Sequence, residues 1–126
     1  QIIVALNIAA VGESFSLGVK AGLDPQTLYQ AIRGGLAGSS VLDAKAPMIM
    51  GRNFKPGFKI NLHLKDLNNA LSTAKDLDLP LPLTGIVQQI LISLFANGRG
   101  ELDHSAIATF FENVGRVEIK SIINGQ

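Results

Sequence analysis

Apolar residues recur along this chain at helical rather than strand spacing. The clearest pattern starts at residue 60, where steps of four, three, four and three separate Ile60, Leu64, Leu67, Leu71 and Ala74. That spacing places these side chains on one face of an α-helix. A second stripe, near the end of the chain, predicts the last helix and comprises Ile107, Phe110, Phe111, Val114 and Val117. No stretch alternates convincingly with the period of a half-buried strand, so the pattern predicts an all-α domain.

The first predicted helix is apolar on nearly every face. Residues 2–11 are apolar except for Asn7, and no proline interrupts the chain before Gly22, where a left-handed helix end is expected. A helix that is apolar all round is buried all round. We therefore expect a helix over 1–21 that runs through the middle of the domain, or between it and a part of a longer protein. The apolar run itself is too short to cross a bilayer.

Prolines and glycines divide the rest of the chain. Asp24 and Pro25 supply a cap and a first-turn proline for a helix over 25–33. Pro47 should kink or restart the next helix, over 41–50, and a loop over 51–59 precedes the helix that begins at Ile60. Pro80 and Pro82 end that helix and start another over 83–97, and Asp103 caps the last one. The sequence thus predicts about six helices around a long, buried first helix.

Composition excludes several classes of protein. The 126 residues are 47% hydrophobic and 17% charged, which is unlike a disordered chain. The net charge of +1 favours neither nucleic acid nor a membrane surface as a partner. The absence of cysteine excludes disulfides and thiolate metal sites, and with two histidines we expect no metal centre. A chain without disulfides fits the cytoplasm.

The small net charge conceals a basic segment. Residues 44–65 contain no acid and five bases, Lys45, Arg52, Lys55, Lys59 and Lys65. A segment of this kind is a candidate anion site. Phe54 and Phe58 lie among the bases and, if exposed, would suit a planar ring that carries phosphates. Lys65 lies off the apolar stripe and could face a cleft. The alternatives are a solvated basic loop and a Lys65 that pairs with Asp66 or Glu112.

Other candidate chemistry is weaker. His63 and Asp66 are three residues apart and could form a surface pair, and His104 should lie in the first turn of the last helix. Ser39 and Ser40 lack the surroundings of a nucleophile elbow, and residues 34–38 do not form a dinucleotide fingerprint. From the residues alone, the chain contains no self-sufficient catalytic set.

Several motifs resemble one known family. They are Gly-Gly-Leu-Ala-Gly-Ser at 34–39, Phe-Lys-Pro-Gly-Phe at 54–58, Leu-His-Leu-Lys-Asp-Leu at 62–67 and Asp-His-Ser-Ala at 103–106, with further matches at 1–7 and 43–48. The chain resembles the C-terminal domain of the β-hydroxyacid dehydrogenases, and within that family the tartronate semialdehyde reductase branch. The resemblance covers nearly the whole chain.

The resemblance implies a helical domain joined by its first helix to an N-terminal Rossmann domain outside this chain. It implies reduction of tartronate semialdehyde (2-hydroxy-3-oxopropanoate) to glycerate with NAD or NADP. Lys65, Phe58 and Asp66 match cofactor-site residues, and Gln1 matches a position that contacts substrate. The catalytic lysine of the family would lie upstream of Gln1, so we expect residues 1–126 to be inactive alone. The choice between NAD and NADP stays open.

A different class of function is compatible with the same residues. The apolar first helix and the positive mean hydropathy would suit a non-catalytic helical oligomerisation module. The two interpretations can hold together, because related enzymes dimerise through this domain. We expect a homo-oligomer, with a small-molecule 2-hydroxy-3-oxo acid as the other partner.

Overall fold

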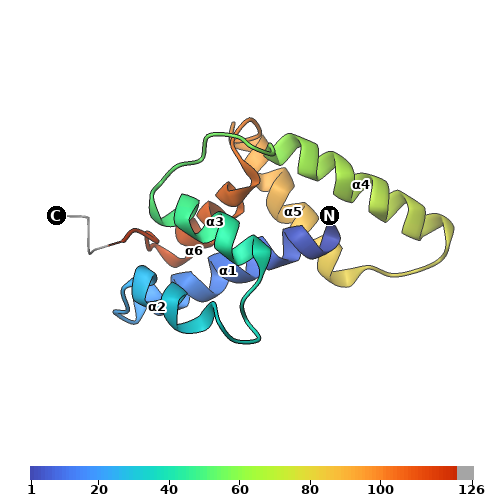
Figure 1. The fold of residues 1–126 in the computed structure, drawn as a ribbon. Helices are drawn as coiled ribbons and strands as arrows, with labels where there is room; N and C mark the ends of the chain where they lie inside the picture. Colours follow the sequence, from blue (N-terminus) through green and yellow to red (C-terminus); the bar gives the residue numbers. More distant parts are fainter. Residues whose placement is uncertain (122–126) are drawn as a thin grey trace.

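The computed structural model describes residues 1–121 and confirms the all-α prediction for them (Figure 1). Within these residues, the only pairing of the β type is an isolated bridge between Lys59 and Asp103. The elements are α1 (Ile2–Lys20), α2 (Pro25–Ile32), α3 (Ser40–Met50), α4 (Ile60–Asp76), α5 (Pro82–Ala96), the 3₁₀ turn η1 (His104–Ala106) and α6 (Ile107–Gly115).

Helix α1 is the centre of the domain. It packs most extensively against α6 and also contacts α2, α3, α4 and α5. Gly12 permits the close approach to α6, because a Cβ atom there would lie 2.8 Å from the Cα atom of Ala108. By length and composition α1 could also cross a membrane, but here its inner face packs as a core helix does.

The outer face of α1 differs from the expectation of burial all round. Ile3 is 76% exposed and Leu17 is 73% exposed, and Ala10 lies between them on the same face. The sequence contains too few polar residues to mark this face as an outer one, so periodicity alone could not separate it from the core side. In the described residues, α1 is thus covered on one side and open on the other.

Two apolar clusters pack on α1. The one at its N-terminal half combines Ala5 and Ile8 with residues of α4, α5 and α6 such as Leu67, Leu91 and Ile107. The other, at its C-terminal half, is formed with α2, α3 and the segment that follows α6. Helix α1 therefore joins the half of the domain that contains α4 to the half that contains α3.

Most helix ends follow the sequence signals. Asp24 accepts a hydrogen bond from the Thr27 N–H at 3.1 Å, and Ser39 accepts one from the Leu42 N–H at 2.8 Å. Gly22 adopts the expected positive φ of 101° after α1. Pro47 does not end its helix: α3 continues to Met50, so the expected restart does not occur. Asp103 caps the turn η1, from which α6 continues.

Candidate functional site

A buried carboxylate joins the loop before α4 to the start of η1. The Asp103 side chain is fully buried, and its Oδ1 accepts hydrogen bonds from the N–H groups of Gly57 at 3.0 Å and Phe58 at 2.9 Å. Its Oδ2 accepts from the Ser105 N–H at 3.0 Å and from Lys45 Nζ at 3.1 Å. Burial alone would raise the pKa of Asp103, but the backbone N–H donors outweigh it and hold the pKa far below its usual range. Asp103 is therefore an anion that fixes this loop.

Two histidines meet in the interior beside this carboxylate. His63 on α4 is fully buried, His104 in η1 is 5% exposed, and their Nδ1 atoms lie 2.8 Å apart. His63 Nε2 lies 3.0 Å from the carbonyl oxygen of Gln1. Burial is the main cause that lowers the pKa of both rings, to about 4 for His104 with Lys45 adding to the effect. Both rings are thus neutral near pH 7.

The predicted surface pair of His63 and Asp66 is wrong, because the His63 side chain points into the core. The signal was present in the sequence: position 63 is three residues after Ile60 and four before Leu67, which are both fully buried. A histidine on the apolar stripe needs a buried polar partner. That partner, His104, is 41 residues away in the chain, and local spacing could not identify it.

Phe58 packs against the histidine pair. Its ring centroid lies 5.6 Å from that of His63 and 5.2 Å from that of His104, in edge-to-face geometry. Phe58 and Phe54 are both half-buried, which corrects the expectation of exposed aromatics. Phe54 lies under the guanidinium of Arg52, 5.2 Å from it. Of the two rings, Phe58 is the one connected to the Asp103 and histidine cluster.

The basic segment is largely neutralised. Lys45 pairs with Asp103, Arg52 Nη2 donates to Glu112 at 2.9 Å, and Lys59 lies 3.0 Å from Glu101. Within residues 1–121, no ion pair involves Lys55 or Lys65. The prediction of one anion site built from all five bases is therefore wrong. Neither alternative partner of Lys65 pairs with it in the described residues: Glu112 binds Arg52, and no ion pair joins Lys65 to Asp66.

Lys65 is exposed on α4, and the half-buried Asp66 lies near the start of α1. A cleft of about 650 Å³ is lined by Gln1, Ile2, Ile3, Asp66 and Ala70. The structure thus brings together Gln1 and Asp66, two of the residues singled out in the sequence. A second cleft, of about 420 Å³, shares Ile2 and Ala70 with the first and extends along α4 toward Leu81. Lys65, next to Asp66 in the chain, lines neither cleft.

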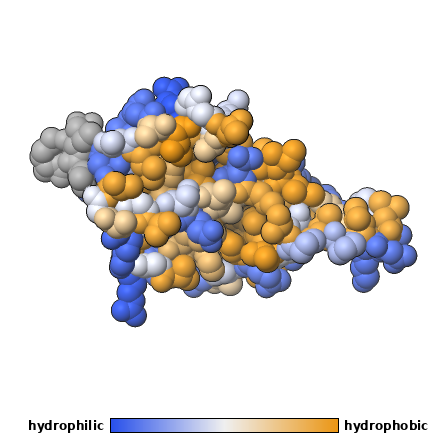
Figure 2. Space-filling model, turned by 90° about the horizontal axis from the view of Figure 1, so that it is seen from below, coloured by the Kyte–Doolittle hydropathy of each residue, from blue (hydrophilic) through white to orange (hydrophobic). Residues whose placement is uncertain are grey.

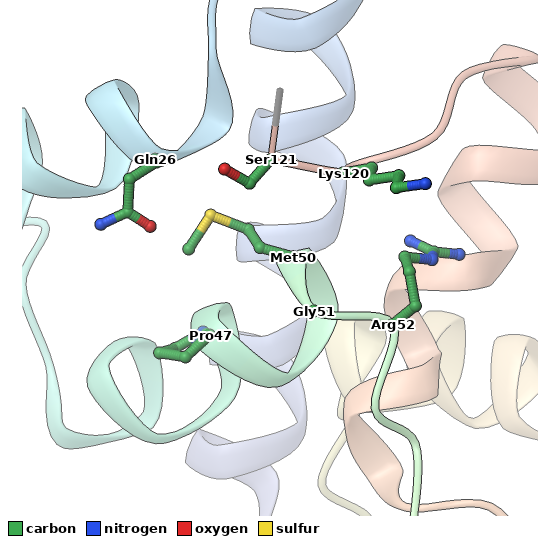
Figure 3. A pocket seen from close by; sticks show the side chains of 7 residues that line it. All are labelled: Gln26, Pro47, Met50, Gly51, Arg52, Lys120 and Ser121. Atoms are coloured by element: carbon green, nitrogen blue, oxygen red, sulfur yellow. The ribbon is translucent and has the colours of Figure 1, made fainter. Parts of the chain in front are cut away.

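A separate pocket of about 340 Å³ lies between α2, α3 and the segment after α6 (Figure 3). Of the residues singled out in the sequence, Arg52 of the basic segment lines it; its full lining is Gln26, Pro47, Met50, Gly51, Arg52, Lys120 and Ser121. The guanidinium of Arg52 is already bound by Glu112. The cleft between α1 and α4 is therefore the better candidate site.

Comparison with known proteins decides the family. The family model described as the NAD-binding domain of NADP-dependent 3-hydroxyisobutyrate dehydrogenase matches residues 1–111. The chain belongs to this family. The fold of this chain agrees with solved structures: a 3-hydroxyisobutyrate dehydrogenase from Salmonella typhimurium matches 88% of the chain with a TM-score of 0.83 at 26% identity. The match covers 39% of that structure's chain.

Two curated relatives illustrate the similarity. The 2-hydroxy-3-oxopropionate reductase of Escherichia coli is 49% identical over 112 residues, which is 89% of this chain and 38% of that enzyme. A probable mitochondrial 3-hydroxyisobutyrate dehydrogenase-like protein of Arabidopsis thaliana is 35% identical over 96% of this chain and 36% of its own length. The chain thus spans less than two fifths of these relatives.

Proposed function

We propose that this chain is the helical domain of an NAD(P)-dependent reductase that converts 2-hydroxy-3-oxopropanoate to glycerate. The observation that carries the proposal is the 49% identity to the E. coli enzyme named for this substrate. Because the chain matches 38% of that enzyme, the activity would belong to a longer protein. We place a Rossmann domain and the catalytic lysine upstream of Gln1, and the whole enzyme in the cytoplasm.

The cleft between α1 and α4 supplies two of the proposed contacts, Gln1 and Asp66. Gln1 is exposed at its wall, and a side-chain amide can both donate to and accept from a hydroxy acid. Lys65 carries an ammonium group without an ion-pair partner in the described residues, as a contact for an anionic cofactor requires. Asp66, the next residue in the chain, lies in the cleft wall, and Lys65 would reach the cofactor from outside that wall. These residues fit a nicotinamide cofactor at this end of the domain.

Phe58 would complete the cofactor site from the loop. Its N–H is held by Asp103 and its ring by the histidine pair, so its orientation is fixed before any ligand binds. When bound, the cofactor supplies the hydride chemistry, and the protein supplies position and charge. In this proposal, Lys65, Phe58 and Asp66 face the cofactor and Gln1 faces the substrate.

We also propose that the protein forms a homo-oligomer through this domain. Figure 2 shows hydrophobic residues gathered over a face of the molecule, on the side where α1 and α2 lie in Figure 1. Ile3 and Leu17 on α1 and the fully exposed Leu36 are large apolar side chains open to solvent. Exposed apolar area of this kind is typical of interfaces. Sedimentation that shows only monomer at micromolar concentration would contradict this part of the proposal.

The catalytic proposal is tested on the complete protein with a panel of semialdehydes and both cofactors. We expect the highest kcat/KM with 2-hydroxy-3-oxopropanoate, and lower values with methylmalonate and succinate semialdehydes. Residues 1–126 alone serve as the control and should give no turnover, because the proton donor and the phosphate-binding loop lie elsewhere. A complete protein that reduces none of the panel would leave the oligomerisation module as the better interpretation.

A further inference from the structure

The two buried histidines form a chain of hydrogen bonds with a fixed direction. A carbonyl oxygen only accepts, so His63 Nε2 must carry the hydrogen in its contact with the Gln1 oxygen, at 3.0 Å. In a neutral ring the other nitrogen then accepts. His104 Nδ1 must therefore donate to His63 Nδ1 across 2.8 Å. The contacts run from His104 through His63 to Gln1.

The chain of contacts ends at α1. The Gln1 oxygen also accepts the Ala5 N–H at 2.9 Å, in the regular pattern of that helix. His63 thus supplies, from α4, a second hydrogen bond to the oxygen of a residue that lines the cleft.

The beginning of the chain of contacts is rigid. The His104 N–H donates to the Phe58 oxygen at 2.7 Å, and the preceding residue is the fully buried Asp103. The charged groups that face the pair are Lys45 from α3, Asp103 before η1 and Asp66 on α4. A ring held in this way can fix the tautomer and orientation of its neighbour, much as outer-shell partners orient ligating histidines.

We propose that His63 and His104 are positioning residues that hold Gln1 at the wall of the cleft in the orientation that substrate binding requires. The role of Gln1 rests on the proposed function; the chain of contacts itself rests on the geometry alone. His104 acts by fixing the tautomer of His63, and His63 acts by holding the Gln1 carbonyl. Neither ring needs to contact the substrate.

Two substitutions of His104 separate this role from packing. His104→Asn keeps an N–H donor at the same number of bonds from Cβ as Nδ1, whereas His104→Leu removes the donor. In the complete protein, the Leu variant should exchange the Ala5 amide roughly 2- to 12-fold faster, which corresponds to the loss of one hydrogen bond. The Asn variant should exchange it at nearly the wild-type rate. Hydrogen exchange measured by NMR or mass spectrometry gives these rates.

The link to the site is tested by steady-state kinetics at a temperature where each variant is folded. His104→Leu should raise KM for 2-hydroxy-3-oxopropanoate by on the order of 10-fold, because a displaced contact residue costs substrate binding. His104→Asn should restore KM to within about twofold. Thr109→Val is the matched control, since it removes another buried hydrogen bond, from Thr109 Oγ1 to the Ala106 oxygen, on α6.

Each outcome decides the proposal. A His104→Leu variant with a lowered melting temperature but unchanged KM and unchanged Ala5 exchange would mean that the histidine pair only stabilises the fold. Equal effects of His104→Asn and His104→Leu would contradict the role of His104 as a hydrogen-bond donor. If the wild-type protein reduces no semialdehyde, the proposed function fails. The Ala5 exchange rates then still support or overturn the chain of contacts.

Discussion

Two buried carboxylates bind bases of the 44–65 segment, and they are held in different ways. Asp103 accepts three backbone N–H groups in addition to Lys45. Glu112 is bound by the guanidinium of Arg52 and accepts one backbone N–H, from Ile119 at 2.6 Å. The first arrangement fixes the loop that contains Phe58, and the second holds the segment after α6. One ion pair, Lys45 with Asp103, therefore holds the loop that contains Phe58, and the other, Arg52 with Glu112, holds the C-terminal segment.

The difference predicts unequal costs for breaking the two pairs. Lys45 is 15% exposed and its partner is fully buried, whereas Arg52 is 29% exposed and can be solvated once Glu112 is lost. A charge left without its partner in the interior is the larger penalty. Loss of Asp103 should therefore destabilise the loop that contains Phe58 more than loss of Glu112 destabilises the C-terminal segment.

The largest effect is expected for Asp103→Ala. The change removes the acceptor of the Gly57, Phe58 and Ser105 N–H groups and leaves Lys45 buried without an anion. We expect a loss of about 3–5 kcal/mol in the free energy of unfolding, measured by urea titration. Adding Lys45→Met should recover part of this loss, and a double variant as unstable as the single one would contradict the ion-pair explanation.

Acid should lower the free energy of unfolding over a defined pH range, because His104 is buried as a neutral ring. The pKa of His104 is lowered from 6.5 to about 4, so the unfolded chain binds its proton first as the pH falls. Stability is therefore complete above pH 6.5 and falls by roughly 3 kcal/mol as the pH drops to 4. The pKa of Asp103 is lowered too, from 3.8, so its contribution begins to be lost only near the lower end of this range and falls mainly below pH 4.

Urea titrations at several pH values between 7 and 4 measure this dependence. The control is His104→Asn, which keeps the donor to His63 but cannot titrate, and which should show a smaller loss over the same range. Lys45, Asp103, Asp66 and the amino group of Gln1, when the chain starts there, are the charged groups that act on the pair. Equal pH dependence in wild type and variant would show that His104 is not the titrating group.

A smaller effect is expected at the other end, for Glu112→Gln. The amide keeps an acceptor for the Ile119 N–H but loses the charge-assisted contacts to Arg52. We expect a cost of about 1.5–3 kcal/mol. Hydrogen exchange should localise the change to the segment that contains Ile119 and leave the loop that contains Phe58 protected. An equal rise in hydrogen exchange in both regions would contradict the claim that Asp103 and Glu112 hold separate parts of the fold.

The sequence predicts the helices well because their signals are local. Asp24, Ser39 and Gly22 act within one turn of their own helices, and the stripe that begins at Ile60 needs only the helical period. The motif residues also lead to Gln1 and Asp66, which share a cleft in the structure. These parts of the prediction depend on residues close together in the chain.

The contacts that connect the helices could not be predicted in this way. Arg52 and Glu112 are 60 residues apart, and Lys45 and Asp103 are 58 apart. Charge counted along the chain made residues 44–65 look like one anion site, although three of the five bases bind acids outside that segment. Only the packing of α3 and α6 against α1 brings these partners together. Lys65 stayed a candidate because α4 turns it toward solvent.

The smallest effect on stability is expected for Lys65→Ala in the complete protein. This variant also tests the proposed cofactor site most directly. The side chain is exposed and lies off the buried stripe of α4, so the free energy of unfolding should change by no more than about 0.5 kcal/mol. Loss of a charge-assisted contact to the cofactor should cost on the order of 1.5–3 kcal/mol, which is roughly a 10- to 150-fold rise in Kd. Lys65→Arg should recover only part of the affinity, because a planar guanidinium does not replace an ammonium group.

Lys55→Ala is the matched control, because Lys55 is also an exposed lysine that has no ion pair within the described residues. It lies in the loop before α4 rather than beside Asp66, so its loss should leave cofactor affinity within about twofold. Calorimetric titration with NADH and NADPH, paired with a thermal melt of each variant, measures both quantities. If Lys65→Ala binds cofactor as the wild type does, Lys65 is not part of the cofactor site. An equal loss in both variants would point to general attraction by the basic segment.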